Sequence, residues 1–176
     1  QACPARALLH FPSPPAGASA PLLLTNPPWA RPFELFSRAL GMPSASEADP
    51  TALMAAAVAH GCRTALPHVT SRSAPMRFLR WSPHDDLVPG AFGLLQPAET
   101  APQCKPDIVL VPMLAYDDRL IRLGQGAGHY DRALSVLDHS IAIGLAWSVQ
   151  FTSALASDVW DVPLDAVLTE KSWITL

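Results

Sequence analysis

The chain has 176 residues, of which 49% are apolar and 15% are charged, and its formal net charge is -3 with a pI near 6.0. This composition is that of a folded globular protein, and the length fits a single domain built on one hydrophobic core. The slightly acidic balance argues against binding to nucleic acid, and no apolar run approaches the ~20 residues of a membrane span.

The first third of the chain is rich in proline and predicts an irregular segment. Ten of the nineteen prolines fall within residues 1–50, in pieces such as Pro12-Ser13-Pro14-Pro15. Proline removes a backbone donor and clashes with the preceding turn, so a long helix is excluded here. Within this third we predict a helical turn or two over Ala5–Phe11 and a helix over Phe33–Leu40 that ends at Gly41.

The next segment predicts a helix followed by two strands. Asp49-Pro50-Thr51 is typical of a helix start, and the helix is expected over Ala52–His60 with Gly61 after its end. Arg63–Pro67 predicts a short strand. Met76–Trp81 predicts a second, half-buried strand because apolar and polar residues alternate along it.

The second half of the chain alternates between strands and helices. Asp107–Pro112 is apolar and rich in β-branched residues, which predicts a central strand covered on both faces. We then expect a helix over Tyr130–Leu137, a buried strand over Ile141–Ala146, a short helix over Ser153–Ala156 and a last strand over Ala166–Thr169. This alternation indicates an α/β fold: a mainly parallel sheet with helices on both faces.

Three alternating glycines lie between the strongest strand and the helix after it, in the run Arg122-Leu123-Gly124-Gln125-Gly126-Ala127-Gly128-His129-Tyr130-Asp131-Arg132. Glycine can adopt positive φ and bring backbone N–H groups close to an anion beside a helix N-terminus. The spacing matches neither a Walker motif nor a dinucleotide fingerprint, and by itself it fits a structural turn as well as a phosphate site. Arg122 and Arg132 add charge suited to polyphosphate, and Asp131 offers an oxygen ligand of the kind that magnesium prefers.

Together with the preceding Val111-Pro112-Met113-Leu114-Ala115-Tyr116-Asp117, this run resembles the signature of the 5-formyltetrahydrofolate cyclo-ligase family. In that family V-P-x-L-A-F-D precedes R-L-G-x-G-x-G-x-Y-D-R. The resemblance continues in the family's order through four further blocks: Glu47–Pro50, Ala65–Pro67, Gly90–Gly93 and Asp161–Glu170. It implies a single domain, residues 1–176, with a family-like core at 42–170 and an atypical part at 1–41.

The resemblance implies an enzyme that uses ATP and Mg²⁺ to convert 5-formyltetrahydrofolate into 5,10-methenyltetrahydrofolate, with release of ADP and phosphate. The formyl oxygen attacks the γ-phosphate, and nitrogen-10 then closes the ring as phosphate leaves. Such chemistry depends on positioning and on stabilisation of charge. A relative that binds folate or nucleotide without turnover stays an alternative, because residues 1–41 contain no counterpart of the family's basic N-terminal helix.

Carried over by position, the resemblance implies catalytic roles for Arg122 and Tyr130. The residues implied to contact ATP are Arg122, Leu123, Gly124, Gln125, Gly126, Ala127, Gly128, His129, Tyr130 and Arg132. Those implied to contact the folate are Met42, Glu47, Gln125, Gly126, Ala127, Gly128 and His129. Asp131 and Asp165 match the magnesium positions.

Four of these assignments have a structural alternative. Asp131 could be only a favourable carboxylate in the first turn of a helix. Asp165 could equally be a turn residue at a strand edge. Glu47 could belong to the loop that leads into the next helix, and His129 could fill space without touching a ligand. We expect the partner to be a reduced folate, the protein to be a monomer, and its location to be the cytoplasm. The spacing of Cys3, Cys62 and Cys104 supports that location because it suits neither a disulfide framework nor a zinc site.

Overall fold

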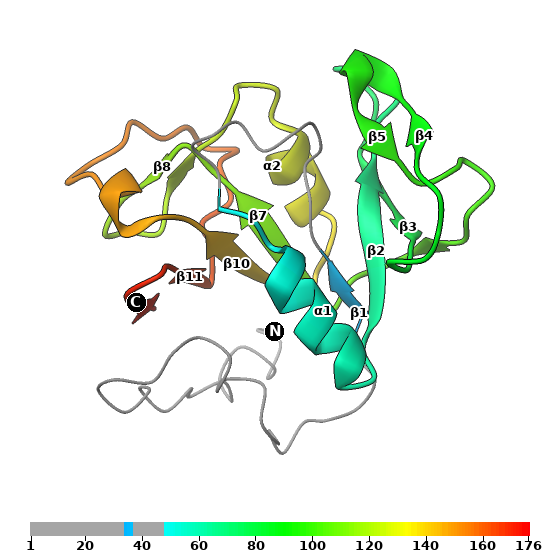
Figure 1. Ribbon diagram of the computed structural model, residues 1–176. Helices are drawn as coiled ribbons and strands as arrows, with labels where there is room; N and C mark the ends of the chain where they lie inside the picture. Colours follow the sequence, from blue (N-terminus) through cyan, green and yellow to red (C-terminus); the bar gives the residue numbers. More distant parts are fainter. Residues whose placement is uncertain (1–33, 37–47) are drawn as a thin grey trace.

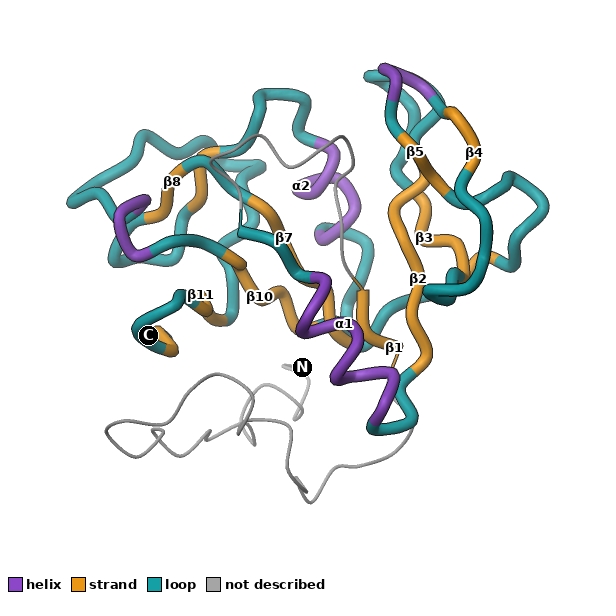
Figure 2. The backbone as a smooth tube through the Cα atoms, viewed as in Figure 1, coloured by secondary structure: helices purple, strands orange, loops and turns teal. Residues whose placement is uncertain are grey.

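The computed structural model describes residues 34–36 and 48–176, the first of these ranges by its backbone alone (Figures 1 and 2). The predicted turn at Ala5–Phe11 therefore lies outside the described residues. In the described part no helix is both long enough and apolar enough to cross a membrane.

The centre of the structure is a sheet of eight strands in the order β12-β11-β10-β7-β1-β2-β3-β6. The strands are β1 (Glu34–Phe36), β2 (Arg63–His68), β3 (Arg77–Arg80), β6 (Gln103–Cys104), β7 (Ile108–Pro112), β10 (Ile141–Leu145), β11 (Ala166–Leu168) and β12 (Trp173–Ile174). Two small antiparallel sheets lie beside it, one of β4 (Val88–Pro89) with β5 (Leu95–Gln96) and one of β8 (Ala115–Tyr116) with β9 (Arg122–Leu123).

The large sheet is mixed, so the expected parallel arrangement holds only for its central strands. The strands from β11 through β10, β7 and β1 to β2 pair in parallel, whereas β12, β3 and β6 pair antiparallel at the two ends. The connections to the antiparallel strands contain no α-helix, and without such a crossover a neighbouring strand usually runs the other way.

The central strands are buried on both faces, as the β-branched run predicted. Val109 and Val111 of β7 are 0% exposed and pack in one cluster with Ala133 and Leu134 of α2 (His129–Leu134). Leu110 faces the other side, in a cluster that includes Leu53 of α1 (Thr51–Ala59). Because neighbouring residues of a strand point to opposite faces, the two helices cover opposite faces of the sheet (Figure 1).

The helix predicted over Phe33–Leu40 is wrong at its centre, since residues 34–36 form β1. This short strand pairs in parallel with both β2 and β7, with Leu35 opposite Thr64 and Ile108. Hydrogen bonds on both sides outweigh the weak local preference of a few residues for a helix.

Two predictions near the C-terminus also need correction. Ser153–Ala156 forms no helix; the nearby helical turn is η4 (Ser148–Gln150), a 3-10 turn like η3 (Ala91–Gly93). The strand Ala166–Thr169 is found as β11 but is not the last one. The backbone N–H of Thr169 donates to the carbonyl of Ser172 at 2.9 Å, and this turn leads into β12.

The remaining predicted elements are present with small differences. The strands at Arg63–Pro67, Asp107–Pro112 and Ile141–Ala146 are confirmed as β2, β7 and β10, and the helix at Ala52–His60 is confirmed as α1. The strand at Met76–Trp81 is found as β3, although both Phe78 and Leu79 are buried. The helix at Tyr130–Leu137 is shorter, because α2 ends at Leu134.

Candidate functional site

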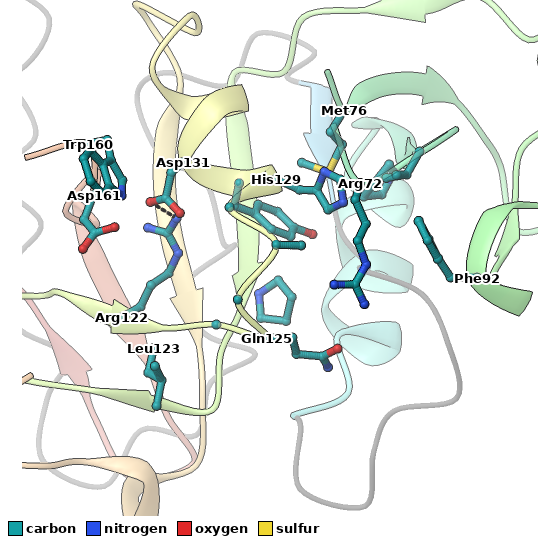
Figure 3. A pocket seen from close by; sticks show the side chains of 18 of the residues that line it. Arg72, Met76, Phe92, Arg122, Leu123, Gln125, His129, Asp131, Trp160 and Asp161 are labelled. Carbon is teal, nitrogen blue, oxygen red and sulfur yellow. Dashed lines mark hydrogen bonds and ion pairs between the residues drawn. The ribbon is translucent and has the colours of Figure 1, made fainter. Parts of the chain in front are cut away.

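A cavity of about 640 Å³ lies where β2 and β7 end, on the side of their carboxyl ends (Figure 3). Ligands of α/β sheets commonly bind at this edge. All ten residues of the run Arg122–Asp131 line it, so the structure brings together the stretch that the sequence singled out. The facing wall is mostly apolar and comes from β2 and the segments around β3 and β5; it comprises Pro67, Val69, Met76, Phe92 and Leu94.

The glycine loop has the backbone shape that its sequence predicted. Gly126 has φ 80° and Gly128 has φ 62°, both in the left-handed region that favours glycine. Among the described residues, no group accepts a hydrogen bond from the backbone N–H of Gly124, Gly126, Ala127 or Gly128. A side chain built at Gly124 or Gly126 would meet nothing within 4 Å. The loop therefore has open space before it and unused backbone donors.

Arg122 is held inside the wall of the cavity by other protein groups. Its Nη2 lies 2.5 Å from Oδ1 of Asp131, and its Nη1 donates to the carbonyl of Val162 at 2.7 Å. The Arg122 side chain is only 6% exposed. The same Asp131 oxygen accepts the N–H of Val162 at 3.2 Å. Arg122 therefore ties β9 to α2 and to the segment at Val162, and Asp131 balances its charge.

Two carboxylates border the cavity on either side of Arg122 (Figure 3). Oδ2 of Asp131 accepts no hydrogen bond from any described residue, and the same holds for Oδ1 of Asp161. Asp161 is held by its Oδ2, which accepts the N–H of Asp158 at 2.8 Å. Asp161 begins the block Asp161–Glu170 that resembles the family, but no role was predicted for it from the sequence.

Asp165, the predicted second metal position, does not line the cavity. Its Oδ2 accepts the N–H of Ala142 at 2.8 Å, and its own N–H donates to the carbonyl of that residue. These contacts join the segment before β11 to β10. No group of three or more His, Cys, Asp or Glu side chains that could hold a metal occurs among the described residues.

His129 and Arg132 form a polar pair at the start of α2. Nη2 of Arg132 lies 3.1 Å from Nδ1 of His129, and Arg132 itself does not line the cavity. Burial lowers the pKa of His129 below its ordinary 6.5, and the positive charges of Arg132 and Arg72 lower it further. The imidazole is thus kept neutral, and Nδ1 acts as an acceptor towards Arg132.

Sequence reasoning missed Arg72 and Gln96. The guanidinium of Arg72 extends along the cavity (Figure 3) and makes no hydrogen bond or ion pair with a described residue. Gln96 is 5% exposed and lines the cavity, and its Oε1 accepts the N–H of Val69 at 3.1 Å. Neither residue lies near the glycine motif in the sequence, so only the folded chain reveals them.

Two further sequence predictions have different outcomes. Tyr130 lines the cavity and packs against the core cluster of the sheet. Met42 and Glu47, predicted to contact the folate, lie outside the described residues.

Comparison with known proteins gives a consistent result. The model of the 5-formyltetrahydrofolate cyclo-ligase family matches residues 39–170. The 5-formyltetrahydrofolate cyclo-ligase of Escherichia coli K12 is 33% identical over 121 residues, which cover 64% of this chain and 66% of that protein, just under two thirds. Its namesake from Mycolicibacterium smegmatis is 33% identical over 147 residues, 76% of this chain and 73% of that protein.

Solved structures agree with the fold. The 5,10-methenyltetrahydrofolate synthetase of Aquifex aeolicus superimposes with a TM-score of 0.62 at 32% identity, covering 81% of this chain and 70% of that one. The 5,10-methenyltetrahydrofolate synthetase of Mycoplasma pneumoniae gives the same TM-score at 24% identity, over 85% of this chain and 79% of that chain, and supports the fold alone.

Proposed function

This chain belongs to the 5-formyltetrahydrofolate cyclo-ligase family, and we propose that it catalyses the ATP-dependent conversion of 5-formyltetrahydrofolate into 5,10-methenyltetrahydrofolate. The observation that carries the proposal is the cavity wall formed by the glycine loop. Its backbone donors at Gly124, Gly126, Ala127 and Gly128 are unused by the described residues. Backbone amides that converge on one concavity are a common cradle for phosphate.

We place the triphosphate of ATP along the glycine loop and the folate ring against the apolar wall. The guanidinium of Arg72 is available to the phosphates from the same cavity. Met76, Phe92 and Leu94 line the cavity with apolar side chains, which suit a bicyclic ring because ligand cavities are mostly apolar. Phe92 is 57% exposed and has φ 62°, a strained value for a residue with a side chain.

The chemistry proceeds in two steps on the bound pair. The formyl oxygen attacks the γ-phosphorus and ADP leaves, which yields an imidate whose oxygen carries the phosphoryl group. Nitrogen-10 then attacks the imidate carbon and loses its proton to solvent, the C–O bond breaks, and inorganic phosphate departs. Each step moves negative charge onto phosphate oxygens, so fixed N–H donors and cations supply most of the stabilisation.

Within this scheme Arg122 and Tyr130 keep the roles implied by the family. Arg122 directs its guanidinium towards Asp131 and Val162, so its contribution is to hold the carboxylate and to place positive charge beneath the phosphates. Tyr130 lines the cavity, and we assign it to the reacting end. We assign Gln125 and His129, which also line the cavity, to contacts with either ligand.

Magnesium fits the carboxylates that line the cavity. It prefers oxygen ligands and is usually held by one or two carboxylates together with substrate phosphates. Asp131 and Asp161 each offer an oxygen that is not used by the described residues, which suits this arrangement better than Asp165 does. When bound, the ion neutralises charge on the phosphates.

We further propose that the enzyme acts as a monomer in the cytoplasm.

A direct assay tests the activity. The purified protein, supplied with 5-formyltetrahydrofolate, ATP and Mg²⁺, should produce the absorbance of the methenyl product and release ADP. Tight folate binding without ATP consumption would instead identify a binding protein, and absence of both would reject the proposal.

Three variants test the metal ligands: Asp131→Asn, Asp161→Asn and Asp165→Asn. We expect the first two to raise the Mg²⁺ concentration for half-maximal rate at least ten-fold, because each loses a charged ligand. Asp165→Asn should leave that concentration unchanged and lower the unfolding midpoint, because its carboxylate holds the Ala142 N–H. The reverse pattern, with Asp165→Asn alone changing the Mg²⁺ requirement, would restore the assignment predicted from the sequence.

A further inference from the structure

Arg132 connects three points on the border of the cavity. Its Nη1 donates to the carbonyl of Ala127 at 3.0 Å, and its Nη2 donates to the carbonyl of Arg72 at 2.9 Å. Nη2 also lies 3.1 Å from Nδ1 of His129. The guanidinium thus links the glycine loop to the Arg72 segment, which is far away in the sequence but lines the same cavity.

The bond to Ala127 fixes the direction of the next backbone amide. In a planar trans peptide the C=O and the following N–H point in opposite directions. With the Ala127 carbonyl directed at Arg132, the N–H of Gly128 is directed away from Arg132. No described residue accepts that N–H, and Gly128 lines the cavity.

Gly128 and Arg132 also fit each other sterically. Gly128 has φ 62°, and a side-chain carbon built on it would lie 3.1 Å from Nη1 of Arg132. The absence of a side chain therefore serves the backbone conformation and also the close approach of the guanidinium.

We propose that Arg132 is a positioning residue, which orients the Gly128 N–H towards the phosphates of ATP and joins the two walls of the cavity, instead of binding phosphate itself. This inference rests on the proposed function. The proposed role of Arg132 requires the forked guanidinium, because two separate nitrogens donate to two carbonyls at once. A lysine would supply the charge but not the fork.

The experiment compares Arg132→Lys and Arg132→Met in the full chain, with Arg80→Met as a matched control, since Arg80 is exposed on β3 and does not line the cavity. Calorimetry measures ATP affinity without folate, and steady-state kinetics measures KM and kcat. We expect both Arg132 variants to weaken ATP binding and to raise KM for ATP at least ten-fold. Arg80→Met should match the wild type.

A second readout does not depend on catalysis. Hydrogen exchange at the Gly128 amide in the presence of ADP should be slowed in the wild type and less so in Arg132→Met.

The outcomes separate the inference from the proposed function. Wild-type ATP affinity in Arg132→Lys would overturn the inference, because a point charge would then suffice, as it would for a direct phosphate ligand. Equal protection of the Gly128 amide by ADP in the wild type and in Arg132→Met would also overturn it. A wild-type protein that does not turn over folate would refute the proposed function alone, while the amide exchange and the ATP affinities of the variants would still decide the inference.

Discussion

Asp117 is a fully buried carboxylate whose replacement gives the sharpest test of how this fold is held together. Its Oδ1 accepts the N–H groups of Arg119 and Ile121, both at 3.0 Å. Its Oδ2 accepts the guanidinium of Arg119, with the shorter contact at 2.7 Å, and the N–H of Leu155 at 3.1 Å. One side chain of 0% exposure therefore fixes the turn after β8 and anchors the segment at Leu155.

Asp117→Asn keeps the shape of the side chain and removes one acceptor and the charge. If the remaining oxygen serves Arg119 N and Ile121 N, those two bonds lose their ionic character, which costs about 1 kcal/mol each. The new NH₂ group then faces the Leu155 donor, and a buried donor without an acceptor costs about 1–3 kcal/mol. Arg119 is half exposed, so water replaces the contact that its guanidinium loses in the variant, and this loss adds little to the cost. We expect the free energy of unfolding to fall by about 3–5 kcal/mol, the sum of these contributions.

The pH dependence of this contribution follows from the direction of the Asp117 pKa shift. Burial alone would raise the pKa, but the hydrogen bonds from Arg119, Leu155 and Ile121 outweigh it and lower the pKa below its ordinary 3.8. The stabilisation is therefore complete above the unfolded value of about 3.9 and is lost as pH falls through the lower folded value. Asp117→Asn should show a flatter acid limb than the wild type.

Urea unfolding followed by fluorescence measures both effects. Asp118→Asn is the matched control, because Asp118 is the exposed neighbour, and its effect should stay within about 0.5 kcal/mol. A loss below about 1 kcal/mol for Asp117→Asn at neutral pH would refute the calculation from unsatisfied donors. A wild-type acid limb unchanged by the mutation would refute the pKa argument.

Three glycine substitutions separate packing from backbone strain. Gly144→Ala should destabilise the fold by about 1–3 kcal/mol with kcat retained, because the new carbon would lie 2.3 Å from Met113 Cε and 2.7 Å from Leu164 Cδ1; a thermal unfolding curve unchanged from the wild type would contradict this. Gly126→Ala and Gly128→Ala should each cost about 1–2 kcal/mol of stability and raise KM for ATP, but Gly128→Ala should raise KM more, since it also displaces Arg132. Equal KM values for the two variants would show that the contact with Arg132 has no influence on the loop.

The strands and the longer helix could be predicted where the signal is local. The β-branched run of β7 and the capped apolar segment of α1 carry their structure in neighbouring residues, and both were found. The two-residue strands β4, β5, β6, β8, β9 and β12 are too short to show any periodicity. Pairing with residues 63–65 and 108–109 determines the strand β1. The sequence of residues 34–36 alone does not indicate a strand.

The candidate site shows the same division between local and distant information. The glycine loop and Asp131 form a continuous motif, so their shared place in the cavity could be anticipated. Arg72, Gln96 and Asp161 come from three other segments and reach the cavity only through the fold. The engagement of Arg122 by Asp131 and Val162 depends on side-chain geometry, which the motif alone does not contain.

In the described sheet, β1 is the seam between two groups of strands. β2, β3 and β6 lie on one side of it and β7, β10, β11 and β12 on the other, so their hydrogen-bonded ladder is continuous only through its three residues. The apolar wall of the cavity comes from the side of the sheet that holds β2, β3 and β6. The glycine loop comes from the other side, because it lies between β7 and β10 in the chain. A ligand that contacts both walls of the cavity would therefore connect the two groups of strands. It would add RT ln(1 + [L]/Kd) to the free energy needed to separate them.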